Sequence, residues 1–341
     1  MLCVTKRLKK YERGSDQAPD ERSALLLAMP TDLNAAPPLL PALKAAKRVI
    51  DTAAGRINLY ESAPQDLAPG LPPLLLIHSI NASASAAEVR PLFEHYRRER
   101  VVIAMELPGY GFSERSERMY TPRLMTDAIH AVLDLLAREH GALPVDVLAL
   151  SLSSEFAARA AMEAPHRIGH LALVSPTGLS RLKARRGAPG SSSYQPRLHA
   201  VLRWPRWSQG LFETLTSPAV IRYFLRKTWG SPHIDPQLWP YCVHTARQEG
   251  ARFAPLCFLS LALFSQDIHT VYESLQCPVW ISMATRGDFT NYRGLALLQT
   301  ASPWNTQKVP GGALPYFEDL PDFVTRLAPF WSGAPGSAAG A

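Results

Sequence analysis

Ser151 is the residue of this chain best placed to act as a nucleophile. It follows the apolar run 145–150, which has β-strand character, and residues that favour a helix come directly after it. A tight turn between a strand and a helix exposes the serine hydroxyl, and the positive end of the helix dipole points to the same place. The usual pattern has glycine two residues before and after the serine, and here the small residues Ala149 and Ser153 take these positions. Such a serine attacks a carbonyl carbon, whereas the plainer interpretation is a serine that only caps the helix.

Strands and helices alternate on both sides of Ser151. Apolar or alternating runs typical of strands are found at 48–62, 71–79, 101–107, 145–150, 168–175, 278–284 and 307–310. Segments with helical character are found at 86–100, 122–140, 292–300 and 322–331. This order predicts an α/β fold with a mostly parallel central sheet and helices on both faces.

The alternation stops at 177–276, which we interpret as a mainly helical insertion. The chain is thereby divided into a core, at 46–176 and 277–332, and the insertion between the two halves of that core. Residues 1–45 are first charged and then rich in proline and alanine, so we expect a flexible N-terminal extension. Residues 333–341, GAPGSAAGA, are expected to form a disordered tail.

Over most of its length the chain resembles the α/β-hydrolase superfamily, with its motifs in the family's order. His78-Ser79 is similar to the family's His-Gly step after a strand. Glu106–Ser113, ELPGYGFS, resembles D-x-P-G-x-G-x-S with Glu for Asp, and Ser151 stands at the elbow position. The insertion occupies the place of the family's helical cap, and Gly287-Asp288 is similar to the loop that carries the catalytic acid. The resemblance implies an α/β-hydrolase fold with an inserted helical cap.

The same resemblance implies roles for individual residues. Ser151 would be the nucleophile, and Asp288 would be the carboxylate that orients the base. The oxyanion would be stabilised by the backbone N–H of Leu152 and by that of either Ser79 or Ile80. An aspartate after glycine is also typical of an ordinary turn, so Asp288 has this second interpretation.

The family's histidine base has no counterpart at its usual position. The segment that resembles G-x-G-H-x-P is Pro310–Pro315, PGGALP, and Ala313 stands where the histidine should be. The triad is therefore degenerate, and proteases that lose one triad member lose most of their rate. His78 is expected to brace a loop, as the same position does in the family. The histidines of the insertion that would have to serve as a substitute base are His233, His244 and His269.

Two interpretations of the function stay open. The first is a serine-hydrolase-like enzyme that acts on a hydrophobic acyl ester or carbonyl compound with an incomplete or rewired triad. The second is a non-hydrolytic enzyme, or a catalytically silent ligand-binding protein, of the same fold. They differ in one requirement, because hydrolysis needs a base within hydrogen-bond reach of Ser151 and ligand binding does not.

The insertion is unusually basic. Residues 181–227 contain ten Lys and Arg and a single acid, Glu213, interleaved with aromatic residues that include Trp204 and Trp207. The plainer interpretation is a solvated lid surface. The alternatives are a lid that recruits an anionic, hydrophobic substrate and a lid that makes peripheral contact with an anionic membrane. The apolar run 253–264 is expected to pack the lid onto the core and to line a pocket.

Composition narrows the range of partners. The net charge of +7 is modest and no basic-aromatic pattern repeats, so we expect no nucleic-acid partner. No apolar run is long enough for a signal peptide or a membrane span. The four cysteines form no C-x-x-C pair, and no His-Cys cluster has zinc spacing. We therefore expect reduced thiols, a cytoplasmic location, and neither a metal nor a cofactor.

Overall fold

The computed structural model of the chain describes residues 38–62, 71–141, 143–288, 290–300 and 304–333. Of the predicted flexible extension at 1–45, only 38–45 belong to these residues, and of the predicted tail only residue 333. One compact unit begins at Leu39, and it contains all the elements named below.

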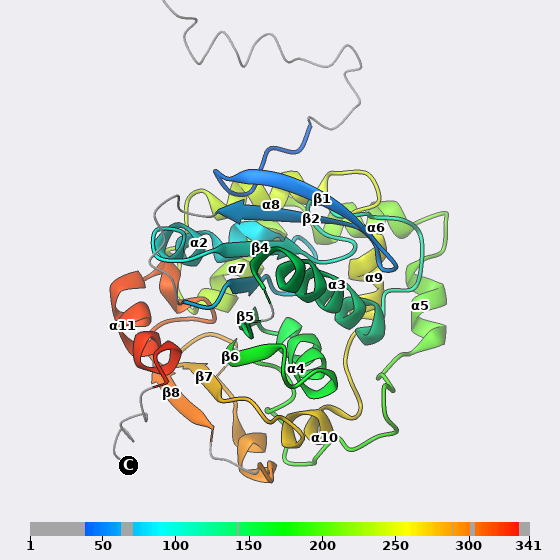
Figure 1. Ribbon diagram of the computed structural model, residues 1–341. Helices are drawn as coiled ribbons and strands as arrows, with labels where there is room; N and C mark the ends of the chain where they lie inside the picture. Colours follow the sequence, from blue (N-terminus) through cyan, green and yellow to red (C-terminus); the bar gives the residue numbers. More distant parts are fainter. Residues whose placement is uncertain (1–37, 63–70, 142, 289, 301–303, 334–341) are drawn as a thin grey trace, which may run out of the picture. The chain divides into compact units, whose positions relative to one another are not determined.

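An eight-stranded sheet forms the centre of the fold (Figure 1). Its strands, in chain order, are β1 (Ala46–Thr52), β2 (Gly55–Ser62), β3 (Leu74–Ile77), β4 (Val102–Glu106), β5 (Val145–Leu150), β6 (Ile168–Val174), β7 (Val279–Ala284) and β8 (Asn305–Val309). Their order across the sheet is β1-β2-β4-β3-β5-β6-β7-β8. Strand β2 pairs antiparallel with β1 and β4, and the remaining neighbours pair in parallel. The carboxyl ends of β3 to β8 therefore meet at one edge of the sheet.

Helices cover both faces, because alternate residues of the central strands point to opposite sides. Val147 and Ala149 of β5 belong to one hydrophobic cluster, and Leu148 and Leu150 belong to the other. The first cluster includes residues of α3 (Pro122–His140), α4 (Ser153–Glu163) and α10 (Ile268–Glu273); the second includes residues of α2 (Arg90–Tyr96) and α11 (Leu320–Trp331). In Figure 1 these two groups lie on opposite sides of the sheet. The predicted α/β class is confirmed.

Helix α3 shows why the sequence pattern was informative. Thr121 caps it, since the side-chain oxygen accepts a hydrogen bond from Leu124 N at 3.2 Å, and proline occupies the first position. The helix ends before Gly141, which has a φ of 84°. These limits are those predicted from the sequence. The helix predicted at 292–300 is wrong, because only one 3₁₀ segment forms there, η2 (Arg293–Leu297). Gly294 of that segment is held against the loop after β6 by a 2.6 Å bond to the carbonyl of Leu179.

Residues 177–276 contain six helices within the described chain. They are α5 (Pro196–Leu202), α6 (Ser208–Leu215), α7 (Pro218–Trp229), α8 (Leu238–Ala246), α9 (Phe253–Leu259) and α10. Helix α10 packs on α4 of the core. Short 3₁₀ segments, η1 (Ala86–Val89) and η3 (Pro315–Phe317), precede α2 and α11. Among the described residues, no helix is both long and apolar enough to cross a membrane.

Candidate active site

Ser151 sits at a strained turn between β5 and α4. Its φ is 50°, in the left-handed region that residues other than glycine rarely adopt. The turn is fixed from both sides: Ser151 N donates to Val174 O at 2.9 Å, and Ser151 O accepts from Ser154 N at 3.2 Å and Thr177 N at 3.4 Å. The hydroxyl is half-buried and makes no hydrogen bond with any described residue. It is therefore free to meet a ligand.

Two backbone N–H groups beside Ser151 are free to stabilise an oxyanion. Strands β3 and β5 are parallel neighbours, and the Ser153 hydroxyl donates to His78 O at 2.5 Å, which joins the start of α4 to the loop after β3. The N–H of Ser79 is occupied, because it donates to Glu88 Oε2 at 2.8 Å. The N–H groups of Ile80 and Leu152 have no acceptor among the described residues. Of the two predicted alternatives, Ile80 is thus the available donor.

His78 is held as a brace. Leu107 N donates to His78 Nε2 at 3.0 Å, so the proton is on Nδ1, which donates to Ser79 O at 2.6 Å. Burial lowers the pKa of His78 to about 4, and the bond to Ser79 opposes this only in part. Both ring nitrogens are occupied and the ring is neutral, so His78 is not available as the base for Ser151.

Ala313, at the position where the family resemblance implies a histidine, packs against the end of α7. Ala313 N donates to Thr228 O at 3.0 Å, and Ala313 O accepts from the Ser175 hydroxyl at 3.0 Å. A Cβ atom at Gly312 would lie 2.5 Å from the Cα and the carbonyl oxygen of Trp229. The backbone of this segment therefore packs directly on the backbone of the α7 end, and Ala313 is buried.

The loop with Asp288 lies under the same helix end. Asp288 N donates to Lys227 O at 3.2 Å, and Lys227 Nζ is 4.0 Å from the Asp288 carboxylate. The Asp288 side chain is 54% exposed. Gly287 has a φ of 85°, and a Cβ there would lie 2.6 Å from Thr228 O. Within the described residues, Asp288 has no polar contact with Ser151 or with a histidine.

The three candidate substitute bases lie on other elements. His233 is exposed between α7 and α8, and His244 is half-buried on α8. His269 on α10 is buried; its Nδ1 accepts from Arg185 N at 2.9 Å, and its Nε2 has no partner. Burial, helped by the charges of Arg185 and Arg186, lowers the pKa of His269. None of the three forms a hydrogen bond with Ser151.

A cavity of about 310 Å³ opens beside the elbow, and most of its residues were not foreseen from the sequence. It is lined by Pro176, Thr177, Gly178, Ser180, Arg181, Arg185, Ser193, Leu261, Phe264, Asp288, Asn291 and Tyr292. Thr177 is the residue whose N–H donates to Ser151 O. The sequence offered one signal for this region, the carboxylate of Glu155 in an alanine-rich helix one turn after Ser151. Within the described chain, no three His, Cys, Asp or Glu side chains gather as a metal site would require.

Comparison with known proteins agrees with the fold described above. Residues 72–224 match the family model described as alpha/beta hydrolase fold. The chain has the α/β-hydrolase fold. No curated protein matches this α/β-hydrolase-fold chain in sequence.

Solved structures of low sequence identity share this fold. A serine hydrolase involved in carbazole degradation, CarC, is 16% identical, with 84% of this chain and 98% of that chain covered and a TM-score of 0.63. Carboxylesterase CesB from Bacillus subtilis is 17% identical, with 86% and 93% covered and a TM-score of 0.61. The enol-lactonase from Burkholderia xenovorans LB400 is 14% identical, with 84% and 100% covered and a TM-score of 0.61. At these identities the likeness concerns the fold.

Proposed function

We propose that this chain binds a small carbonyl or acyl compound at Ser151 and does not hydrolyse it by a serine–histidine–acid triad. The observation that carries the proposal is the packing of Gly312 and Ala313 against the end of α7, where the family's base stands. The free N–H groups of Ile80 and Leu152 provide donors for a polarised carbonyl oxygen. A site with donors and a hydroxyl, but without a base, suits binding or a reaction that needs only positioning and an oxyanion site.

A second candidate is a serine hydrolase with a rewired triad, and one observation favours it. The φ of 50° at Ser151 is a costly conformation, and strain of this kind is usually retained at functional residues. Similar structures include a carboxylesterase and an enol-lactonase, so esters and lactones are the compounds to test first. This candidate requires His233, His244 or His269 to approach Ser151, which in turn requires movement of α8, α10 or the loop between α7 and α8.

Labelling with a fluorophosphonate probe, together with turnover of 4-nitrophenyl butyrate, distinguishes the two candidates. We expect no labelling of the wild type under conditions that label an active carboxylesterase. We also expect any turnover to stay within about 10⁴-fold of the uncatalysed rate, the activity that survives loss of a triad. Labelling that disappears in Ser151→Ala, together with faster turnover, would overturn the proposal in favour of the rewired hydrolase.

The basic cap surface supports a further proposal, peripheral contact with an anionic membrane. Leu198, Val201, Trp204 and Trp207 recur every three residues and are 38–57% exposed. The two tryptophan rings stack with centroids 5.9 Å apart. Exposed arginines at 197 and 206 flank them, as in interfacial segments that contact anionic lipid. Sedimentation with phosphatidylglycerol vesicles, but not with phosphatidylcholine vesicles, is expected for the wild type and should be lost in Trp204→Ala/Trp207→Ala.

A further inference from the structure

Three residues with strained backbones lie in the cavity lining or next to it in the chain or by a hydrogen bond. Among the described residues other than glycine, positive φ values are found only at Ser151 (50°), Ser175 (49°) and Leu261 (62°). Leu261 lines the cavity, Ser175 directly precedes lining residue Pro176, and Ser151 O accepts the N–H of lining residue Thr177. Strained residues persist where the surrounding structure fixes them, and they cluster at binding and catalytic sites. Their distribution singles out this cavity.

The cavity is amphipathic. Leu261 and Phe264 provide an apolar wall, and Arg181, Arg185 and Asn291 provide polar groups. Its volume of about 310 Å³ is at the lower end of the range for small-molecule sites. It therefore suits a compact ligand with an apolar body and one polar end.

The two arginines have donors to spare. Arg185 makes one side-chain contact, from Nη2 to Glu155 Oε1 at 3.3 Å, and no described residue accepts from its other guanidinium N–H groups. Arg181 is exposed and its side chain has no partner in the described chain. These groups offer hydrogen-bond donors to an anion.

Charge in the lining favours an anion at the arginine side. The single acidic lining residue, Asp288, is half-exposed and lies 4.0 Å from Lys227 Nζ. The lining also contains two cations, Arg181 and Arg185. The guanidinium group of arginine can donate two parallel hydrogen bonds to the two oxygens of a carboxylate.

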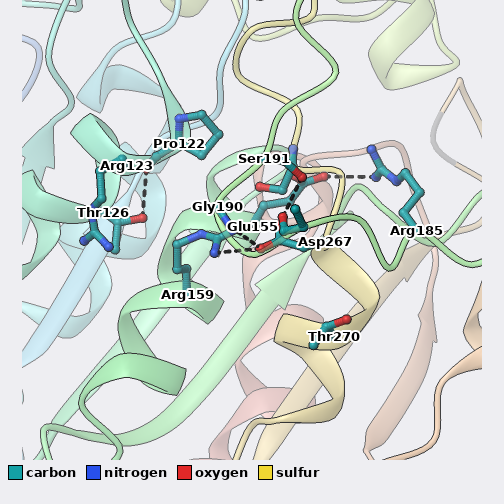
Figure 2. A network of polar contacts seen from close by, with 12 residues as sticks. Pro122, Arg123, Thr126, Glu155, Arg159, Arg185, Gly190, Ser191, Asp267 and Thr270 are labelled. Carbon is teal, nitrogen blue, oxygen red and sulfur yellow. Dashed lines mark hydrogen bonds and ion pairs between the residues drawn. The ribbon is translucent and has the colours of Figure 1, made fainter.

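Arg185 is held at the cavity by a buried network on α4 (Figure 2). Glu155 also accepts from the Thr177 hydroxyl at 2.6 Å and from Ser265 N at 2.8 Å. Arg185 supplies the positive charge beside this buried carboxylate through one guanidinium N–H, and its other N–H groups meet no acceptor among the described residues. Figure 2 shows Arg185 reaching Glu155 from the side opposite Arg159.

We propose that this cavity binds a small hydrophobic carboxylate, with the carboxylate on Arg185 and Arg181 and the apolar body against Leu261 and Phe264. The inference rests on the proposed function, because it names the class of compound brought to Ser151. Glu155 and Thr177 are positioning residues in this arrangement, and they act through Arg185.

Calorimetric titration with two matched pairs tests the proposal: phenylacetate against phenylacetamide, and 4-phenylbutanoate against its amide. We expect at least one carboxylate to bind about tenfold or more tightly than its amide, and this preference to be lost in Arg185→Gln and reduced in Arg181→Gln. Arg186→Gln is the matched control, since Arg186 is paired with Glu273 at the surface and lies outside the cavity lining. The Arg186→Gln variant should prefer carboxylate over amide to the same extent as the wild type.

Arg185→Gln leaves Glu155 without its cation, so Arg185→Lys is included as a variant that retains the charge; it should keep part of the preference. No preference for either carboxylate, or equal losses in Arg185→Gln and Arg186→Gln, would overturn the inference. The outcome is separable from that of the proposed function, because carboxylate binding is measured in Ser151→Ala, where no serine can react. Hydrolysis together with a carboxylate preference would refute the proposed function alone, and no preference without labelling would refute this inference alone. A preference without labelling supports both.

Discussion

At the scale of single residues, the backbone of Ser151 is held in its conformation by the sheet and by the loop after β6. Glycine would adopt a φ of 50° without strain, whereas alanine would keep the strain and remove the hydroxyl. We therefore expect Ser151→Gly to be about 1 kcal/mol more stable than Ser151→Ala in urea unfolding. The same two substitutions at Ser154, inside α4, give the opposite order because glycine weakens a helix. Equal stabilities for both substitutions at Ser151 would contradict the strain.

His78 makes stability depend on pH. Its pKa is about 4 in the folded protein, below its ordinary value of 6.5, so between these values the unfolded chain binds a proton that the folded chain does not. The contribution is fully present above pH 6.5 and is lost as the pH falls through 4. It amounts to about 3 kcal/mol. Urea unfolding from pH 7 to pH 4 should show this loss in the wild type and a smaller one in His78→Asn. Parallel pH profiles would show that His78 is not the buried neutral brace described here.

At the scale of elements, α4 is tied to the insertion by a buried ion pair. Arg159 donates to Asp267 at 2.6 and 3.1 Å, and Asp267 also accepts from Gly190 N. Because breaking a buried pair leaves a charge unpaired, we expect Arg159→Met to cost about 3 kcal/mol in urea unfolding. Arg159→Met/Asp267→Leu should recover most of that loss, since no charge is left unpaired.

The exposed pair of Arg123 with Asp127 is the control for this ion pair. Both side chains are about half exposed. Arg123 also pairs with Glu163, and Arg123→Met, which removes both surface contacts, should still cost no more than about 1 kcal/mol. A double variant at 159 and 267 as unstable as Arg159→Met alone would mean that the loss comes from packing and not from an unpaired charge.

The local sequence pattern predicted most helices and strands, whereas the arrangement of the site depends on contacts between residues far apart in the sequence. The strand before Ser151, helix 122–140 and the mostly parallel sheet follow from apolar spacing within short windows. The choice between Ser79 and Ile80 could not be made that way, because it depends on the side chain of Glu88 reaching back to Ser79 N. Nor could the sequence show that Arg185 contacts Glu155, since the contact joins an irregular loop to a helix. The sequence showed alanine at position 313, where the family resemblance implies a histidine, but it did not show that the end of α7 packs there.

The docking of α7 on the core depends on glycine. A Cβ at Gly312 would overlap the backbone of Trp229, so Gly312→Ala must displace the helix end. We expect a loss of about 2 kcal/mol in unfolding free energy and faster amide exchange at the end of α7. Gly210→Ala in α6 is the control: no atom lies within 4 Å of the added Cβ, and the substitution should be neutral or stabilising. Unchanged exchange in Gly312→Ala would show that α7 is not held by this contact.

At the scale of the whole molecule, residues 177–276 contact the sheet and its helices at two places with different consequences. At α4 they bring Arg185 and Thr177 to a cavity next to Ser151, which creates room for a ligand. At the loops after β7 and β8 the end of α7 lies against Gly287 and Gly312, which removes the room that a base and its acid would need. The two contacts together are the basis of the proposed binding function.

This arrangement predicts the result of an attempt to rebuild the triad. Ala313→His restores the residue that the family motif requires, but Ala313 is buried beneath Thr228 and the Asp288 side chain is exposed beside Lys227. A histidine there would lack both a path to Ser151 and an acid to orient it. We expect kcat/KM for 4-nitrophenyl butyrate to remain within about threefold of the wild-type value, well below the 10²–10⁴-fold that a positioned general base contributes. An increase above tenfold in Ala313→His that is abolished in Ser151→Ala/Ala313→His would mean that α7 yields and that the loss of one histidine alone silenced the site.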